Sequence, residues 1–272
     1  MNITERNFFR LVRCGAFQRK ETIEPMSAYK WGKLYQLAVI HDVAAIVYQG
    51  LLASKDQFFL QLPAQQWERW EKTTGEAKLD STENDDLLRA DHLTNPLLNR
   101  KLQSILDDEQ SDTPTRQFLL TILRTSRHIL NEGVPVRELV TLGKEMQQES
   151  HKVNFMLLDK WIKSLKLQQV VQLEGWLLIH LLGFDASEIP FLGERIGNDV
   201  ETVTQELIQL SSKRHEEFYF SQADGNIFVH TSNGNAMLGR LRRSARYFRY
   251  YPSETLTNFF ASFVHSLSHI EE

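Results

Sequence analysis

Apolar residues recur at steps of three and four along most of this chain, which is the spacing of an amphipathic α-helix. The stretch EPMSAYKWGKLYQLAVIHDVAAIVYQGLLAS shows the pattern twice in succession, in two groups (Trp31, Leu34, Leu37, Ala38 and His41, then Ala44, Val47, Tyr48 and Leu51). Ser27 is suited to cap the start of the first helix. We expect the helix to break near His41 and Asp42.

Start and stop signals predict several further helices. Thr113, as a cap with Pro114 at the first helical position, marks one start, and Pro135 marks the next in the same way. The run VVQLEGWLLIHLLG is apolar almost all round, which is typical of a central buried helix, and Gly183 is expected to end it.

Two local signals complete the prediction of the fold. Asp185 and Glu188 predict a reciprocal cap for a short turn. The segment EFYFSQADGNIFVHTS places aromatic and β-branched runs around Asp224 and Gly225, which indicates a hairpin. We therefore expect a mainly α, multi-helical bundle with at most one small β-hairpin near residues 217–231.

The composition changes between residues 62 and 112, where polar side chains dominate and apolar positions are sparse. This stretch predicts one or two solvent-exposed helices, separated near Asp80 and Ser81. It is the best candidate for an excursion from the main body, but no Gly/Ser-rich linker marks a boundary. We expect an N-terminal helical region (1–112) and a C-terminal helical region with the hairpin (113–272), forming one compact unit.

Charge and cysteine content limit the classes of function. The formal net charge is −4, so we do not expect general nucleic-acid binding, which depends on many Lys and Arg side chains. Cys14 is the only cysteine, which excludes an intrachain disulfide and a thiolate-rich metal site. The longest apolar run, from Trp176 to Phe184, is far shorter than the roughly 20 residues of a membrane span. We expect a cytoplasmic protein with no membrane partner.

Catalytic and cofactor motifs are missing from the sequence. It contains no G-x-x-x-x-G-K-[ST], no G-x-G-x-x-G between a strand and a helix, and no G-x-S-x-G. Asp199 and Glu201 have the spacing of a metal-binding pair, but the flanking pattern is helical, and acids favour the first turn of a helix. We therefore predict no catalytic residue and no bound cofactor.

Histidine and cysteine positions favour packing over chemistry. His265 and His269 lie one helical turn apart, but Ser266 stands where a zinc-binding H-E-x-x-H motif needs glutamate. His41 lies on the apolar face of its helix, and Cys14 lies between apolar neighbours, so both are expected in the core. No metal site is predicted.

The run LGRLRRSARYFRYYPSE, residues 238–254, is the strongest candidate for a binding surface. Its periodicity predicts an amphipathic helix that ends before Pro252, with an apolar face and an arginine face; Arg240 stands apart from both. The arginine face comprises Arg242, Arg243, Arg246 and Arg249. Guanidinium groups so grouped suit an anion or a phosphate-bearing ligand, through bidentate contacts. The alternative is that they pair with acids elsewhere in the chain.

Four segments in collinear order resemble the uncharacterised nucleotidyltransferase family of Bacteroidetes and other bacteria. They are FFRLVRCGAF, WGKLYQLAVIHDVAAIVYQGL, LLTILRTSRHILNEGVPVRELVTLG and RLRRSARYFRYYPSETL. The resemblance implies N- and C-terminal helical regions like those that flank the catalytic core in that family. The core itself should lie between Leu62 and Arg116, yet its Gly-Gly or Gly-Ser loop and its paired aspartates cannot be found there, and Thr141 stands where the family tends to have an acid. No catalytic residue is carried over.

Three hypotheses follow. The first is a non-catalytic helical protein of bacterial origin, a degenerate form of that family that binds a protein or a phosphate-bearing ligand. The second is an active nucleotidyltransferase with a divergent core hidden in residues 62–112. The third is a nucleic-acid or phosphate binder that acts through the Arg240–Arg249 helix.

Overall fold

The computed structural model describes residues 1–58, 60–76, 91–108, 112–131, 136–193 and 248–257. The fold is mainly helical, as the sequence predicts, and the described residues contain no strand. The predicted hairpin at 217–231 lies outside these residues. The elements in chain order are α1 (Ile3–Phe17), α2 (Ala28–Ile40), α3 (Ala44–Ala53), α4 (Ala64–Glu76), α5 (Pro96–Leu106), α6 (Thr113–Asn131), α7 (Val136–Glu149), η2 (Ser150–Lys152), α8 (Phe155–Ser164), α9 (Gln168–Leu182) and η3 (Ala186–Glu188). Residues 252–257 are also helical.

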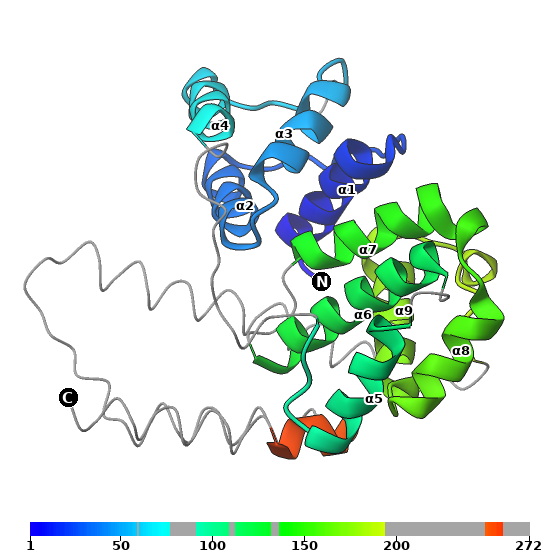
Figure 1. Cartoon of the computed structure of the whole chain (residues 1–272). Helices are drawn as coiled ribbons and strands as arrows, with labels where there is room; N and C mark the ends of the chain where they lie inside the picture. Colours follow the sequence, from blue (N-terminus) through cyan, green and yellow to red (C-terminus); the bar gives the residue numbers. More distant parts are fainter. Residues whose placement is uncertain (59, 77–90, 109–111, 132–135, 194–247, 258–272) are drawn as a thin grey trace, which may run out of the picture.

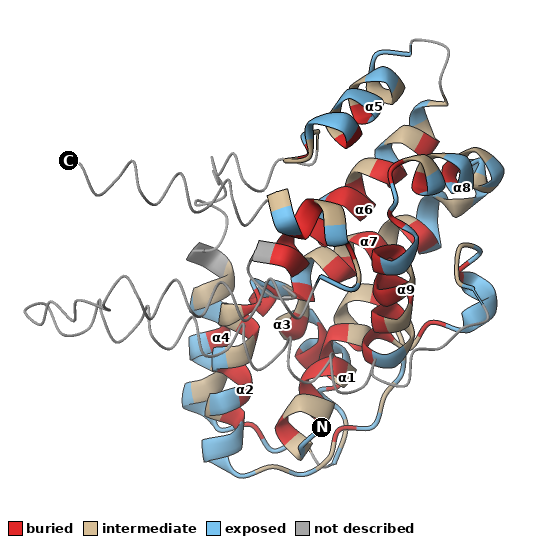
Figure 2. Ribbon diagram, turned by 90° about the horizontal axis from the view of Figure 1, so that it is seen from below, coloured by how far each residue is buried: buried red, intermediate tan, exposed pale blue. Residues whose placement is uncertain are grey.

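Helices α1 to α4 lie together, and α5 to α9 form a second group beside them (Figure 1). Helix α1 joins the two groups, since it packs on α3 and also contacts α7 and α9. Helix α9 is buried over most of its circumference, as its apolar sequence predicts, and it lies among the buried faces of α6 and α7 (Figure 2). No helix in the described ranges is long and apolar enough to cross a bilayer.

The predicted helix boundaries are largely confirmed. Ser27 is the N-cap residue of α2, which ends at Ile40 before a turn in which Asp42 has φ 50°. Helix α6 starts at Thr113, one residue before the predicted position, and the hydroxyl of Thr115 bonds the Asp112 carboxylate. Helix α7 starts at Val136, directly after Pro135, which lies outside the described residues.

The end of α9 follows its local signals. Gly183 is left-handed, with φ 70°, a conformation that glycine adopts without steric cost. Just beyond it, the Glu188 carboxylate accepts a hydrogen bond of 2.7 Å from the Asp185 backbone N–H, in the predicted reciprocal cap.

The polar stretch 62–112 supplies α4 and α5, and each buries an apolar stripe. Trp70 of α4 is fully buried against Tyr35, with ring centroids 4.9 Å apart. Leu98 and Leu102 of α5 are also buried. Residues 77–90, which include Asp80 and Ser81, lie outside the described part.

Helices α1 and α3 approach so closely that only glycine fits at two positions. A Cβ on Gly15 would overlap the Ile46 carbonyl oxygen, and a Cβ on Gly50 would overlap the Leu11 carbonyl oxygen. The backbones of the two helices are therefore in direct contact.

Candidate functional site

The predicted arginine face is described only at its end. Arg242, Arg243 and Arg246 lie outside the described residues, as does Arg240, so their grouping stays a prediction. Arg249 is exposed; its Nη2 donates to the Tyr250 hydroxyl at 2.6 Å, and its guanidinium carbon lies 4.7 Å from the centre of the Tyr250 ring. This arginine is therefore at the surface and stacked on its neighbour.

The chain changes direction after the arginine-rich stretch. Residues 248–250 form a turn, so the predicted helix does not continue through Arg249. A new helical segment starts at Pro252, a position that suits proline because the first helical residue needs no backbone donor. The structure describes the residues on both sides of Pro252, from 248 to 257.

Glu254 anchors this segment in a buried polar cluster at the start of α5. Its Oε1 accepts from the Thr94 backbone N–H at 2.7 Å, and its Oε2 accepts from the Asn95 backbone N–H at 3.1 Å. Nη1 of Arg127, on α6, lies 3.3 Å from the same Oε1. Arg127 also donates to the His92 carbonyl oxygen at 2.5 Å. The carboxylate is therefore held by one cation and two main-chain donors.

The Arg127–Glu254 pair is almost completely removed from water, with side-chain exposures of 3% and 1%. Burial of two charges costs free energy that their attraction repays only with good additional hydrogen bonds. The N–H groups of Thr94 and Asn95 supply such bonds at the positive end of the α5 dipole. The Arg127–Glu254 pair therefore specifies the position at which residues 248–257 contact the body, even if it adds little to the free energy of folding.

Tyr251 is the second anchor of the segment. Its hydroxyl donates to the Leu165 carbonyl oxygen at 3.0 Å, between α8 and α9. Burial, with a smaller contribution from the Glu254 charge, raises the pKa of this hydroxyl well above its usual range. Tyr251 is therefore a neutral hydrogen-bond donor throughout the physiological range of pH.

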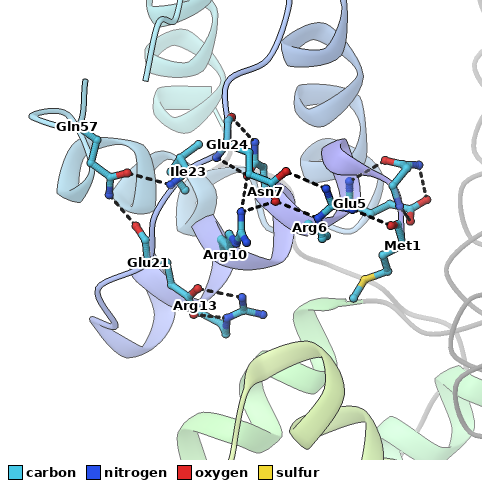
Figure 3. A network of polar contacts seen from close by, with 11 residues as sticks. Met1, Glu5, Arg6, Asn7, Arg10, Arg13, Glu21, Ile23, Glu24 and Gln57 are labelled. Atoms are coloured by element: carbon cyan, nitrogen blue, oxygen red, sulfur yellow. Dashed lines mark hydrogen bonds and ion pairs between the residues drawn. The ribbon is translucent and has the colours of Figure 1, made fainter. Parts of the chain in front are cut away.

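Arginines near the N-terminus have structural partners (Figure 3). Arg6 contacts Glu24 in bidentate fashion, from Nε at 2.9 Å and Nη2 at 2.8 Å, and Arg10 lies 2.7 Å from the same carboxylate. The hydrogen bonds that Arg6 donates are the main cause that lowers the pKa of Glu24 to about 2. The charge of Arg6 and the hydrogen bond and charge of Arg10 add to this effect, and desolvation opposes it. Arg13 binds Glu21 at 2.6 Å and the Leu181 carbonyl oxygen at 2.8 Å. These contacts hold the segment after α1 in place.

A further buried carboxyl group lies on α9. The Ser126 hydroxyl donates to Oε1 of Glu174 at 2.8 Å, and Oε2 of Glu174 has no hydrogen-bond partner. Burial raises the pKa of Glu174 well above its ordinary value, and the Ser126 hydrogen bond only partly opposes this. Burial therefore favours the neutral form of the Glu174 carboxyl group.

The other residues considered for chemistry take structural places or lie outside the described part. Cys14 is buried, with its Sγ 3.9 Å from the Ser54 hydroxyl, and His41 is buried beside Phe8, so both expectations of a core position are confirmed. The acidic pair and the histidine pair lie outside the described part (Asp199, Glu201, His265 and His269). Across the described ranges, no group of three or more His, Cys, Asp or Glu side chains could hold a metal ion.

No motif in the sequence points to Arg127, Tyr251 or Glu254 as functional residues. One signal was available, because Arg127 follows Leu123 by one helical turn and so lies on the buried side of α6. A charged side chain at such a position requires a buried partner. The sequence carries no comparable signal that this partner is Glu254.

The chain matches no family model, and comparison with curated proteins and with solved structures gives no significant match.

Proposed function

We propose that this protein is a non-catalytic helical binding or accessory protein that contacts a phosphate-bearing partner through its arginine-rich stretch, residues 238–249. One observation carries the proposal: the residues that follow this stretch are anchored in the body. Tyr251 and Glu254 are buried, and Arg249 is exposed two residues before the first anchor. Anchoring one end of a binding segment lowers the entropy that it loses when a ligand binds.

The chemistry of arginine supports this choice of partner. The planar guanidinium group offers paired donors that match two phosphate oxygens, and it stacks on aromatic rings as Arg249 does on Tyr250. Arg6, Arg10 and Arg13 have carboxylate partners that tie α1 to the segment after it. A ligand competing for those arginines would have to displace a carboxylate.

We infer the origin of the protein from its resemblance to the nucleotidyltransferase family. The four collinear segments support descent from that family with loss of its catalytic core. The alternative of an active enzyme needs paired acids on strands within residues 62–112. The described residues there include α4 and α5, while 77–90 and 109–111 lie outside the description, so that alternative stays a hypothesis.

Fluorescence anisotropy with a fluorescent ATP analogue tests the proposal. We expect saturable binding that weakens with added salt, because phosphate contacts are electrostatic. Arg243→Glu combined with Arg246→Glu should weaken binding by at least about tenfold, the effect of losing one or more charge-assisted hydrogen bonds.

A matched control separates a local effect from one of net charge. Lys55→Glu combined with Lys160→Glu changes the total charge by the same amount at two exposed positions of the body. This control should bind as the wild type does. Equal binding by all three proteins, or equal losses in both variants, would contradict the proposed role of the arginines.

A further inference from the structure

The segment 248–257 lies beside the start of α5 (Figure 1). Only a few of its side chains are buried. Tyr251, Glu254 and Thr255 are 1%, 1% and 3% exposed. Their neighbours Phe248 and Leu256 are 48% and 50% exposed. This distribution is typical of a peptide ligand, in which a few anchor side chains carry recognition.

The groups that hold the anchors belong mostly to the main chain of the body. The Leu165 carbonyl oxygen accepts from the Tyr251 hydroxyl, and the backbone N–H groups of Thr94 and Asn95 donate to Glu254. Arg127 supplies the single side-chain cation. Asn95 is the N-cap residue of α5, Thr94 directly precedes it and Leu165 is the C-cap residue of α8, so these main-chain groups lie at helix ends and form a preorganised site for one hydroxyl and one carboxylate.

We propose that the body carries a recognition site for a peptide with the pattern Tyr-x-x-Glu, which the chain fills with its own Tyr251–Glu254 and which the same segment of a second copy also fits. The site consists of the Leu165 carbonyl, the N-terminus of α5 and Arg127. The segment that fills it follows the arginine-rich stretch in the sequence, and the inference does not depend on the proposed function.

The docked segment can leave this site while the rest of the fold persists. Tyr251 is the only fully buried hydrophobic residue among residues 248–257, and Tyr250 is partly buried against the core, so the apolar surface that undocking exposes on the segment comes mainly from these two side chains. The attraction between Arg127 and Glu254 is offset by the cost of removing both charges from water. Segments with few buried apolar contacts open at lower free energy than the core does.

The contacts predict the selectivity of the site. A peptide with phenylalanine in place of the tyrosine leaves the Leu165 carbonyl without its donor and should bind several-fold more weakly. A peptide with glutamine in place of the glutamate leaves Arg127 buried without a counter-charge. Its affinity should fall by at least about thirtyfold.

A synthetic peptide of residues 248–257, FRYYPSETLT, represents the segment of a second copy. Its receptor is the full chain with Tyr251→Ala and Glu254→Gln, in which the chain's own ligand is weakened. We expect saturable binding to this variant, loss of binding with the glutamine peptide, and much weaker binding to the wild-type chain, whose site is filled. Absence of binding to the folded variant would overturn the proposal.

Hydrogen exchange of the wild-type chain gives a second test that requires no variant. The amide of Thr255, which donates to the Tyr251 carbonyl oxygen, should exchange through a local opening while the amides of α9 stay protected. If the variant does not fold, this measurement decides alone. Exchange of Thr255 only together with α9 would show that the segment is an integral part of the core and would overturn the proposal.

Discussion

Glu254 and Glu24 are both paired with arginine, but burial gives the two carboxylates different consequences. Glu254 is 1% exposed and depends on main-chain donors as well as on Arg127. Glu24 is 29% exposed and is shared by Arg6 and Arg10. The first acts as a docking contact between distant parts of the chain, and the second ties a loop to the helix that precedes it.

Replacing Glu254 tests whether its segment can detach. Loss of one partner of a buried ion pair generally costs about 3–5 kcal/mol, because the other charge stays buried. If the segment undocks as proposed, Arg127 regains contact with water, and Glu254→Gln should then cost less than this. Urea unfolding gives the free energy, with Glu149→Gln at an exposed pair as control, expected to lose at most about 1 kcal/mol. If Glu254→Gln lowers the free energy of unfolding by about 3–5 kcal/mol, the segment cannot detach.

The lowered pKa of Glu24 predicts that the free energy of unfolding depends on pH. Its pKa is lowered from 4.5 to about 2 in the folded state, so the folded protein binds fewer protons there than the unfolded chain. The stabilisation is complete above pH 4.5 and is lost as the pH falls towards 2. The difference in free energy of unfolding between wild type and Glu24→Gln should therefore be largest at neutral pH and shrink below about pH 4.5. A difference that stays constant between pH 7 and pH 3 would contradict this role.

At the scale of helices, the contact between α1 and α3 depends on Gly15 and Gly50, where an added Cβ would overlap backbone atoms of the other helix. Gly50→Ala should destabilise the protein by at least about 1–3 kcal/mol in urea unfolding, because helix backbones cannot move aside as a flexible side chain can.

The chain supplies a matched control for this prediction. Gly32 lies on α2, and a Cβ there would meet nothing closer than the Gln66 side-chain nitrogen at 4.0 Å. Gly32→Ala should stabilise the protein by up to about 1 kcal/mol, since alanine favours the helix. Destabilisation by both changes would show that the close approach of α1 and α3 is not the cause.

Helix boundaries were predictable because their signals are local. Ser27 is the N-cap residue of α2, although its side chain makes no capping hydrogen bond, and Gly183 is the C-cap residue of α9. Buried positions inside the polar stretch 62–112 were harder to predict, because their burial depends on other helices. Trp70, for example, packs against Tyr35 of α2. A stripe of apolar residues predicts that a face is buried but does not identify the element that covers it.

At the scale of the whole molecule, the docking of the C-terminal segment could not be predicted. Arg127 and Glu254 are separated by 127 positions, and neither lies in a motif that specifies the other. The surrounding sequence indicated an arginine face, whereas the structure adds an acidic and an aromatic anchor immediately after it. The structure therefore shows where the residues that directly follow the arginine-rich stretch are anchored.

The most direct test of a binding protein without catalysis is an assay for nucleotidyl transfer. The full chain is incubated with Mg²⁺, each labelled nucleoside triphosphate in turn, and nucleic-acid, protein and small-molecule acceptors. We predict no labelled product above the level found without protein. Transfer that depends on the protein and is abolished by substituting a single Asp or Glu would contradict the account and establish an active nucleotidyltransferase.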